Sequence, residues 1–295
     1  MEIVVLGAGS LGSLLGGLLS TAHDVTLVGR DPHVSAVRES GLTLTGAVER
    51  TVRPDARTEP PAGADLAVVT VKSYDTPTAA AALADCSLDA AVSLQNGMGN
   101  EERLAAALSC PVLAGTCTYG ALLEEPGTVR CTGIGDVVLG PRAGGRSTAG
   151  DRVGEAFRGG DIRTTVASDM PRRLWRKLAV NAGINATTAL ARVENGALVD
   201  GPAGETTREA ARETARVADA QGVDLDPEAA AERTINVAET TAENVSSMHQ
   251  DVRGERRTEV DAINGYVVDQ AVQAVPINRT LASLLRAWER ERGLR

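Results

Sequence analysis

The segment Gly7–Gly12 places the strongest constraint on how this chain can fold. It reads Gly-Ala-Gly-Ser-Leu-Gly, follows the aliphatic run Ile3–Leu6, and precedes an apolar helical stretch through Leu19. A second aliphatic run, Asp24–Val28, completes a unit of the length that a βαβ fold requires. In such units the first glycine permits the tight turn, the second lets the backbone approach a pyrophosphate, and the helix N-terminus supplies N–H donors. The segment therefore predicts a dinucleotide-binding turn.

Strand and helix patterns continue to alternate up to about residue 166, which favours a mostly parallel, doubly wound α/β sheet of the Rossmann type over residues 1–167. Further strands are predicted at Leu42–Leu44, Leu66–Val71, Ala90–Leu94, Val112–Cys117, Thr128–Cys131, Val137–Leu139 and Ile162–Thr165. Helices between them are predicted at His33–Glu39, Thr76–Ala84, Glu101–Leu108 and Thr148–Phe157.

From residue 168 onward the strand patterns stop, and an all-α domain is predicted over residues 168–295. Ser168 and Asp169 can cap a helix, Pro171 suits its first turn, and apolar periodicity continues to about Leu190. Further helices are predicted over Asp200–Gln221, ended by Gly222, and over Pro227–Val245, Glu255–Val275 and Asn278–Glu291.

Composition narrows the class of protein. Hydrophobic residues make up 43% of the chain with only six aromatics, which predicts a globular protein with an aliphatic core. No apolar run approaches the ~18 residues of a membrane span. The first residues lack a basic region followed by an apolar one, so we expect no signal peptide and a cytoplasmic protein.

The net charge and the spacing of the cysteines and histidines argue against several further classes of protein. The net charge of −9 argues against binding of nucleic acid, because phosphates would be repelled. This acidic balance also resembles that of proteins from salt-adapted organisms. If this protein is salt-adapted, its free energy of unfolding should rise with molar KCl. No metal site or disulfide framework is expected, because the histidines lie far apart and the cysteines show no C-x-x-C spacing; they are Cys86, Cys110, Cys117 and Cys131.

The first predicted helix of the second domain carries a polar row. Lys177, Asn181 and Asn185 stand at i, i+4 and i+8 among leucines and alanines, so they share one helix face. Of the 30 basic residues only Lys72 and Lys177 are lysines, and the other 28 are arginines. An ammonium loses its proton more readily on burial, whereas a guanidinium stays protonated. Lys177 is therefore a candidate general acid, and a solvated polar face is the alternative.

Three further candidates follow predicted strands at the edge where doubly wound sheets bind ligands. Arg30 comes just after Asp24–Val28 and suits the 2′-phosphate of NADP, although Asp31 next to it keeps NAD open and an ordinary surface arginine is the alternative. Lys72 is a candidate for a second phosphate contact. The segment Gln95–Gly99 is a candidate for lying under a nicotinamide, or it is an ordinary Asn-Gly turn.

Five segments taken together resemble the ketopantoate reductase (2-dehydropantoate 2-reductase) family, and the resemblance runs from residue 1 to about residue 290. In order they read Gly-Ala-Gly-Ser-Leu-Gly, Gln-Asn-Gly-Met-Gly, Leu-Trp-Arg-Lys-Leu-Ala-Val-Asn, Ala-Glu-Asn-Val-Ser-Ser-Met and Thr-Glu-Val-Asp-Ala-Ile-Asn-Gly. The resemblance implies reduction of 2-dehydropantoate to (R)-pantoate with NADPH, on the route to pantothenate and coenzyme A.

The resemblance also implies residue roles. The catalytic residue would be Lys177. Cofactor contacts would be Gly7, Ala8, Gly9, Ser10, Leu11, Gly12, Arg30, Lys72, Asn96, Ala121 and Glu259. Substrate contacts would be Asn96, Asn181, Asn185, Asn195 and Ser247.

The expected cofactor is NADPH, and NADH remains possible. The expected binding partner is a small 2-keto acid substrate. We expect binding of neither nucleic acid nor a membrane, and a homodimer remains possible. The alternatives are a related 2-keto or β-hydroxy acid dehydrogenase and a non-catalytic NADP(H)-sensing binding protein.

Overall fold

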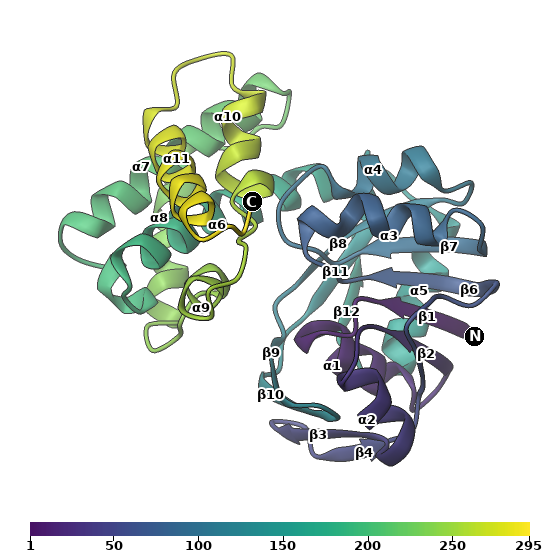
Figure 1. The fold of residues 1–295 in the computed structure, drawn as a ribbon. Coiled ribbons are helices and arrows are strands. Elements are labelled where there is room, and N and C mark those ends of the chain that lie inside the picture. Colours follow the sequence, from purple (N-terminus) through teal and green to yellow (C-terminus); the bar gives the residue numbers. More distant parts are fainter. The chain divides into compact units, whose positions relative to one another are not determined.

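The chain divides into two compact units, shown in Figure 1 in a computed structural model that describes all 295 residues. Unit 1 comprises Met1–Gln95 and Asn100–Met170, and unit 2 comprises Asn96–Gly99 and Pro171–Arg295. The four residues Asn96–Gly99 therefore pack with the helical unit, although their chain neighbours on both sides belong to unit 1. None of the helices combines the length and the hydrophobicity that crossing a lipid bilayer requires.

Unit 1 is built on an eight-stranded sheet in the order β12-β11-β8-β7-β6-β1-β2-β5. Its pairs are parallel except that β11 runs antiparallel to β8. The strands are β1 (Glu2–Leu6), β2 (Asp24–Val28), β5 (Asp55–Arg57), β6 (Gly63–Val69), β7 (Ser87–Ser93), β8 (Val112–Cys117), β11 (Val137–Pro141) and β12 (Thr164–Val166). The chain leaves β1 for β2 on one side and later returns to β6 on the other. This reversal creates the switch point at which sheets of this type bind ligands.

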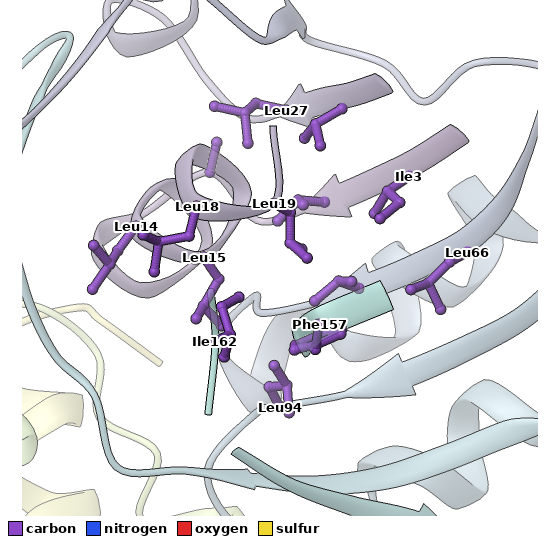
Figure 2. Packing of buried hydrophobic residues seen from close by; sticks show 14 of the residues in the cluster. Ile3, Leu14, Leu15, Leu18, Leu19, Leu27, Leu66, Leu94, Phe157 and Ile162 are labelled. Atoms are coloured by element: carbon purple, nitrogen blue, oxygen red, sulfur yellow. The ribbon is translucent and has the colours of Figure 1, made fainter. Parts of the chain in front are cut away.

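Helices cover both faces of this sheet because its strands alternate their side chains. Val5 contributes to the core under α1 (Ser10–Leu19) and α5 (Thr148–Gly159), whereas Val4 and Leu6 contribute to the core under α3 (Thr76–Leu83) and α4 (Asn100–Ala107). Helix α2 (His33–Ser40) packs beside β5. Figure 2 shows the first core, in which the leucines of α1 meet strand residues and Phe157, the only phenylalanine of the chain.

A second sheet of four strands, absent from the sequence prediction, covers α1. Its order is β4 (Arg50–Val52), β3 (Leu42–Gly46), β10 (Thr128–Gly133) and β9 (Gly120–Glu125). The predicted strands at Leu42 and Thr128 exist, but they pair with each other here and not within the main sheet. Sequence reading missed β4, β5 and β9, because β4 and β5 have only three residues each and β9 exposes Leu122 and both of its glutamates.

Unit 2 is entirely helical, so the predicted succession of an α/β sheet and an α-helical half is confirmed. Helix α6 lies at the centre of an alanine-rich core that it shares with α7 and α11. The elements are α6 (Met170–Ala191), the 3₁₀ turn η2 (Asn195–Leu198), α7 (Pro202–Ala220), α8 (Pro227–Thr240), α9 (Ser247–Arg253), the π-helical turn η3 (Asp261–Gly265), α10 (Tyr266–Gln270) and α11 (Pro276–Glu291).

Two helix predictions in this unit are wrong in extent. The helix expected up to Val245 ends at Thr240, and a separate helix α9 follows. The helix expected over Glu255–Val275 is broken, because Glu255 takes a left-handed φ of 49° and the backbone N–H of Thr258 donates to the Glu289 carboxylate at 2.8 Å. A side-chain acceptor from α11 thus replaces the acceptor that a helix would supply.

Candidate active site

The glycines of the turn between β1 and α1 differ in the space around them: two lie in close contact with other protein atoms, and one does not. Gly7 has φ of 109°, and a Cβ placed there would lie 2.6 Å from the backbone nitrogen of Val71. A Cβ on Gly12 would lie 2.2 Å from the carbonyl oxygen of Gly7. On Gly9, which is exposed, it would meet nothing closer than 4.0 Å. Gly7 and Gly12 are thus required by packing, whereas the requirement at Gly9 would have to come from a ligand.

The helix that follows this turn begins without a side-chain cap. No side chain accepts from the first N–H groups of α1, and its first turn holds no acidic residue. Uncapped N–H groups and the positive end of the helix dipole favour an anion. Ser10 is engaged elsewhere, since its hydroxyl accepts a hydrogen bond from the N–H of Leu123 at 3.0 Å, two residues from Ala121 in β9.

The cations expected at the cofactor follow strands that flank β1. Arg30 comes after β2, and its side chain is 88% exposed while donating to the Asp75 carboxylate at 3.2 Å. Lys72 caps the short 3₁₀ turn η1 (Ser73–Asp75), three residues after the end of β6, which stops at Val69 and not at Val71 as predicted. The Arg30–Asp75 contact therefore joins the loops after β2 and β6 on the carboxyl edge of the sheet.

One oxygen of the Asp31 carboxylate is held by α2. Oδ1 accepts hydrogen bonds from the hydroxyl of Ser35 at 2.6 Å and from the N–H of Ser35 at 3.1 Å, and these bonds hold the pKa of Asp31 below its usual value. Both bonds end on the same oxygen and the side chain is exposed, so a role for Asp31 toward the ribose of NAD stays a prediction.

Helix α6 presents the polar row that the sequence predicted on one face. The helix is unbroken through this region, with Lys177 and Asn181 half-buried and Asn185 buried. The apolar residues between them, such as Leu178 and Ala182, belong to the core of unit 2, as does Trp175 just before them, whose ring centroid lies 5.9 Å from that of Tyr266. The row is thus neither a solvated face nor fully enclosed.

Asn195 and Ser247 differ in how strongly the fold already uses them. The buried Asn195 donates to the Thr241 hydroxyl at 2.9 Å. Ser246, not Ser247, caps α9, since its hydroxyl accepts from the N–H of His249 at 3.2 Å. Ser247 is the first residue of the helix and its side chain is exposed.

The segment Asn96–Gly99 lies against the turn that follows Glu259. Met98 donates its N–H to the carbonyl of Ala262 at 2.9 Å, and Gly97 approaches so closely that a Cβ there would lie 2.5 Å from the Cβ of Ala262. Glu259 itself is buried, three residues before Ala262. Unit 2 therefore holds Asn96 and Glu259 on adjoining segments, a proximity that sequence spacing alone could not reveal.

Metal and disulfide chemistry have no visible basis. No group of three His, Cys, Asp or Glu side chains is arranged to hold a metal ion, and all four cysteines are free thiols.

Known proteins match the chain along its whole length. The family model described as ketopantoate reductase PanE/ApbA matches residues 3–144, and the model for the C-terminal part of the same family matches residues 169–289. The chain belongs to this family. It is 46% identical to the 2-dehydropantoate 2-reductase of Halobacterium salinarum over 99% of this chain and 100% of that protein, and 40% identical to that of Archaeoglobus fulgidus over 98% of each.

Solved structures confirm the ketopantoate reductase fold. A PanE/ApbA family ketopantoate reductase from Ralstonia eutropha superposes with a TM-score of 0.91 at 32% identity, covering 99% of this chain and 100% of that one. D-mandelate dehydrogenase in complex with NADH and anilino(oxo)acetate also gives a TM-score of 0.91, at 23% identity and with full coverage of both chains. Because proteins with different names share this fold, the fold by itself does not specify the substrate.

Proposed function

We propose that the chain is a 2-dehydropantoate 2-reductase, which uses NADPH to reduce the keto group of 2-dehydropantoate to (R)-pantoate in the biosynthesis of pantothenate and coenzyme A. The observation that carries this proposal is the full-length 46% identity to the Halobacterium salinarum protein of that name. The half-buried Lys177 on α6 agrees with it, because ketone reduction needs a proton donor that can become neutral.

We assign binding of the cofactor to residues 1–167 and the reacting groups to residues 168–295. The open Gly9 and the uncapped N-terminus of α1 suit a pyrophosphate, and Arg30 suits the 2′-phosphate of NADPH. The remaining cofactor contacts of the proposal are Ala8, Ser10, Leu11, Lys72, Asn96, Ala121 and Glu259.

In this reaction NADPH, when bound, supplies the hydride to the ketone carbon. As negative charge grows on the ketone oxygen, Lys177 hydrogen-bonds that oxygen and delivers the proton to it. Glu259 holds the ammonium and a ribose hydroxyl in place. The substrate's hydroxyl, carbonyl and carboxylate are oriented by Asn96, Asn181, Asn185, Asn195 and Ser247.

A decisive experiment replaces Lys177 by alanine and measures steady-state kinetics with 2-dehydropantoate and NADPH. Loss of an oxyanion donor and proton source costs about 3 kcal/mol or more of transition-state stabilisation, so kcat should fall at least about 100-fold. The matched control is Lys72→Ala, the only other lysine, which should raise the KM for NADPH while kcat changes little. Near-normal turnover in Lys177→Ala would rule out the assignment.

The same assay separates the alternatives. Pyruvate or ketoisovalerate turned over more efficiently than 2-dehydropantoate would indicate a related keto acid dehydrogenase. Tight NADPH binding without turnover of any keto acid would indicate a sensing protein. The proposal further includes a cytoplasmic location, which cell fractionation tests, and leaves a homodimer open to a mass measurement in solution.

A further inference from the structure

The π-helical turn η3 adjoins several of the proposed reacting groups. Its defining bond runs from the N–H of Gly265 to the carbonyl of Val260 at 2.8 Å. Such turns are rare and occur often at functional sites. Glu259 lies two residues before the turn, and Met98, two residues after Asn96, donates its N–H to the carbonyl of Ala262 within it.

One side chain of this turn reaches the helix that carries Lys177. Asn264 is fully buried, and its amide donates to the carbonyl of Ala182 at 3.0 Å and to the side-chain oxygen of Asn278 at 2.9 Å. Ala182 lies in α6 directly after Asn181. Both partners are acceptors, which fixes the amide nitrogen toward them. Asn264 therefore connects η3 to the polar row of α6.

A second layer of buried hydrogen bonds anchors Asn264 from behind. The amide of Asn278 donates to the carbonyl of Ala210 at 3.0 Å and to the Glu213 carboxylate at 2.8 Å. That carboxylate also accepts the N–H groups of Ile277 and Asn278, each at 2.9 Å, at the start of α11. These bonds join α7 and α11, which lie side by side in Figure 1. Asn264 is thus held against a rigid pair of helices.

The far side of the turn is attached independently to α11. Both the N–H and the hydroxyl of Thr258 donate to one oxygen of Glu289, at 2.8 and 2.6 Å, and Arg286 donates to the Asp261 carboxylate at 2.9 Å. Removing the Asn264 amide would therefore leave the turn attached to the protein. What it would lose is the bond that sets its register against α6.

The two ends of the Asn264 amide are used unequally. Its side-chain oxygen is buried without a hydrogen-bond partner, which costs about 1–3 kcal/mol. A buried apolar side chain would avoid that cost, but it would leave the buried side-chain oxygen of Asn278 without its donor and would release the Ala182 carbonyl. What asparagine adds at this position is therefore the link to α6.

We propose that Asn264 is a positioning residue that keeps Glu259 and Asn96 in register with Lys177 by holding η3 against α6. This inference rests on the proposed function for the identity of the reacting groups. Asn264 itself acts only through the elements it joins, so its loss should affect the geometry of the reaction more than the stability of the fold.

The first test compares Asn264→Ala with Thr234→Val. Thr234 is equally buried, and its hydroxyl donates to the carbonyl of Ala230 at 2.7 Å within α8, so its loss is a matched buried defect that shares no partner with Asn264, Asn278 or Glu213. Misplacing a catalytic group by about 1 Å costs up to ~100-fold in rate, so kcat of Asn264→Ala should fall about 10- to 100-fold while Thr234→Val retains it. Both are assayed well below their unfolding temperatures, and Asn264→Ser replaces Asn264→Ala if the latter does not fold.

The second test does not depend on turnover. Since Lys72 and Lys177 are the only lysines, reductive ¹³C-methylation gives two side-chain lysine signals, and Lys72 serves as the internal reference. The Lys177 signal should move in the Asn264 variant and stay in place in Thr234→Val. A wild-type protein that leaves 2-dehydropantoate unreduced, combined with this shift, would refute the proposed function and keep the positioning role.

The positioning role is overturned by a folded Asn264 variant with wild-type kcat, or by a fall in kcat without movement of the Lys177 signal. Failure of both Asn264 variants to fold would also overturn it, because the amide would then maintain the helical unit as a whole.

Discussion

Gly9 and Gly12 belong to the same turn, yet the structure predicts opposite consequences for the same substitution. Gly9 has φ of −91° and ψ of −157°, an extended conformation open to any residue, and its added Cβ would have 4.0 Å of clearance. Gly12 is in the first turn of α1, where a Cβ would lie 2.2 Å from the Gly7 carbonyl oxygen and 2.5 Å from the Thr70 hydroxyl. Gly9→Ala should therefore impair binding, and Gly12→Ala should impair folding.

Two opposing effects set the stability of Gly9→Ala. Alanine restricts the unfolded chain, which stabilises the protein by about 0.4–1 kcal/mol, but it is a poorer N-cap residue than glycine by a similar amount. The free energy of unfolding should thus stay within about 1 kcal/mol of wild type. A methyl group at the pyrophosphate should weaken a charge-assisted hydrogen bond worth about 1.5–3 kcal/mol, so the Kd for NADPH should rise roughly 10- to 100-fold.

For Gly12→Ala the contact is with backbone, which can move only if β1 or α1 shifts. Overpacking of this kind costs about 1–3 kcal/mol or more. Urea unfolding without cofactor and fluorescence titration with NADPH measure the two quantities separately. Unchanged NADPH affinity in Gly9→Ala would refute the assignment of the turn to the pyrophosphate. Wild-type stability in Gly12→Ala would refute the packing argument.

Three further predictions concern Arg30, Glu101 and the net charge of the protein. Arg30→Ala should raise the KM for NADPH about tenfold and leave that for NADH unchanged, and steady-state kinetics with both cofactors decide. Burial raises the pKa of Glu101 to about 7 from 4.5, so the stability that it contributes is present below pH 4.5 and lost as the pH rises through 7. Glu101→Gln should therefore be more stable than wild type at pH 8, by up to about 3 kcal/mol in urea unfolding, and show no such gain below pH 4.5. Finally, screening of the net charge of −9 should raise the free energy of unfolding between about 0.1 M and about 2 M KCl, and a flat or falling profile would exclude salt adaptation.

Sequence patterns located the helices and strands that bury their apolar side chains, and they missed the strands that expose most of their side chains. The boundaries of β2 and β8 agree with prediction to the residue, because their apolar side chains, such as Leu27 and Val28 of β2, pack into cores on both faces of the sheet. Strand β4 reads Arg-Thr-Val and β9 exposes both of its glutamates, so neither carries an alternating pattern. These strands exist because β3 and β10 offer them partners far along the chain, and that information is not local.

Within the candidate site, residue type and spacing suggest roles for side chains, but only the structure shows which of these side chains already bond to other residues. The sequence makes Arg30 the expected cofactor contact and only keeps NAD use open through Asp31, and the structure adds that Ser35 engages one oxygen of Asp31. Asn264 stood in one of the five segments that carry the family resemblance, yet no spacing rule connects it with Ala182, 82 residues earlier. The only local pattern at Asn264 is an asparagine followed by a glycine, and that pattern is equally typical of a turn.

Because Asn96–Gly99 packs with unit 2, the residues proposed to act on the substrate all lie in one unit. Lys177, all five proposed substrate contacts and Glu259 then belong to one unit, whereas the glycine turn, Arg30, Lys72 and Ala121 belong to the other. Two proposed cofactor contacts, Asn96 and Glu259, are exceptions, and they lie on the two segments that meet at η3. The turn is therefore where cofactor contacts and the proton donor share one rigid support, which is why a small buried amide there should matter to turnover.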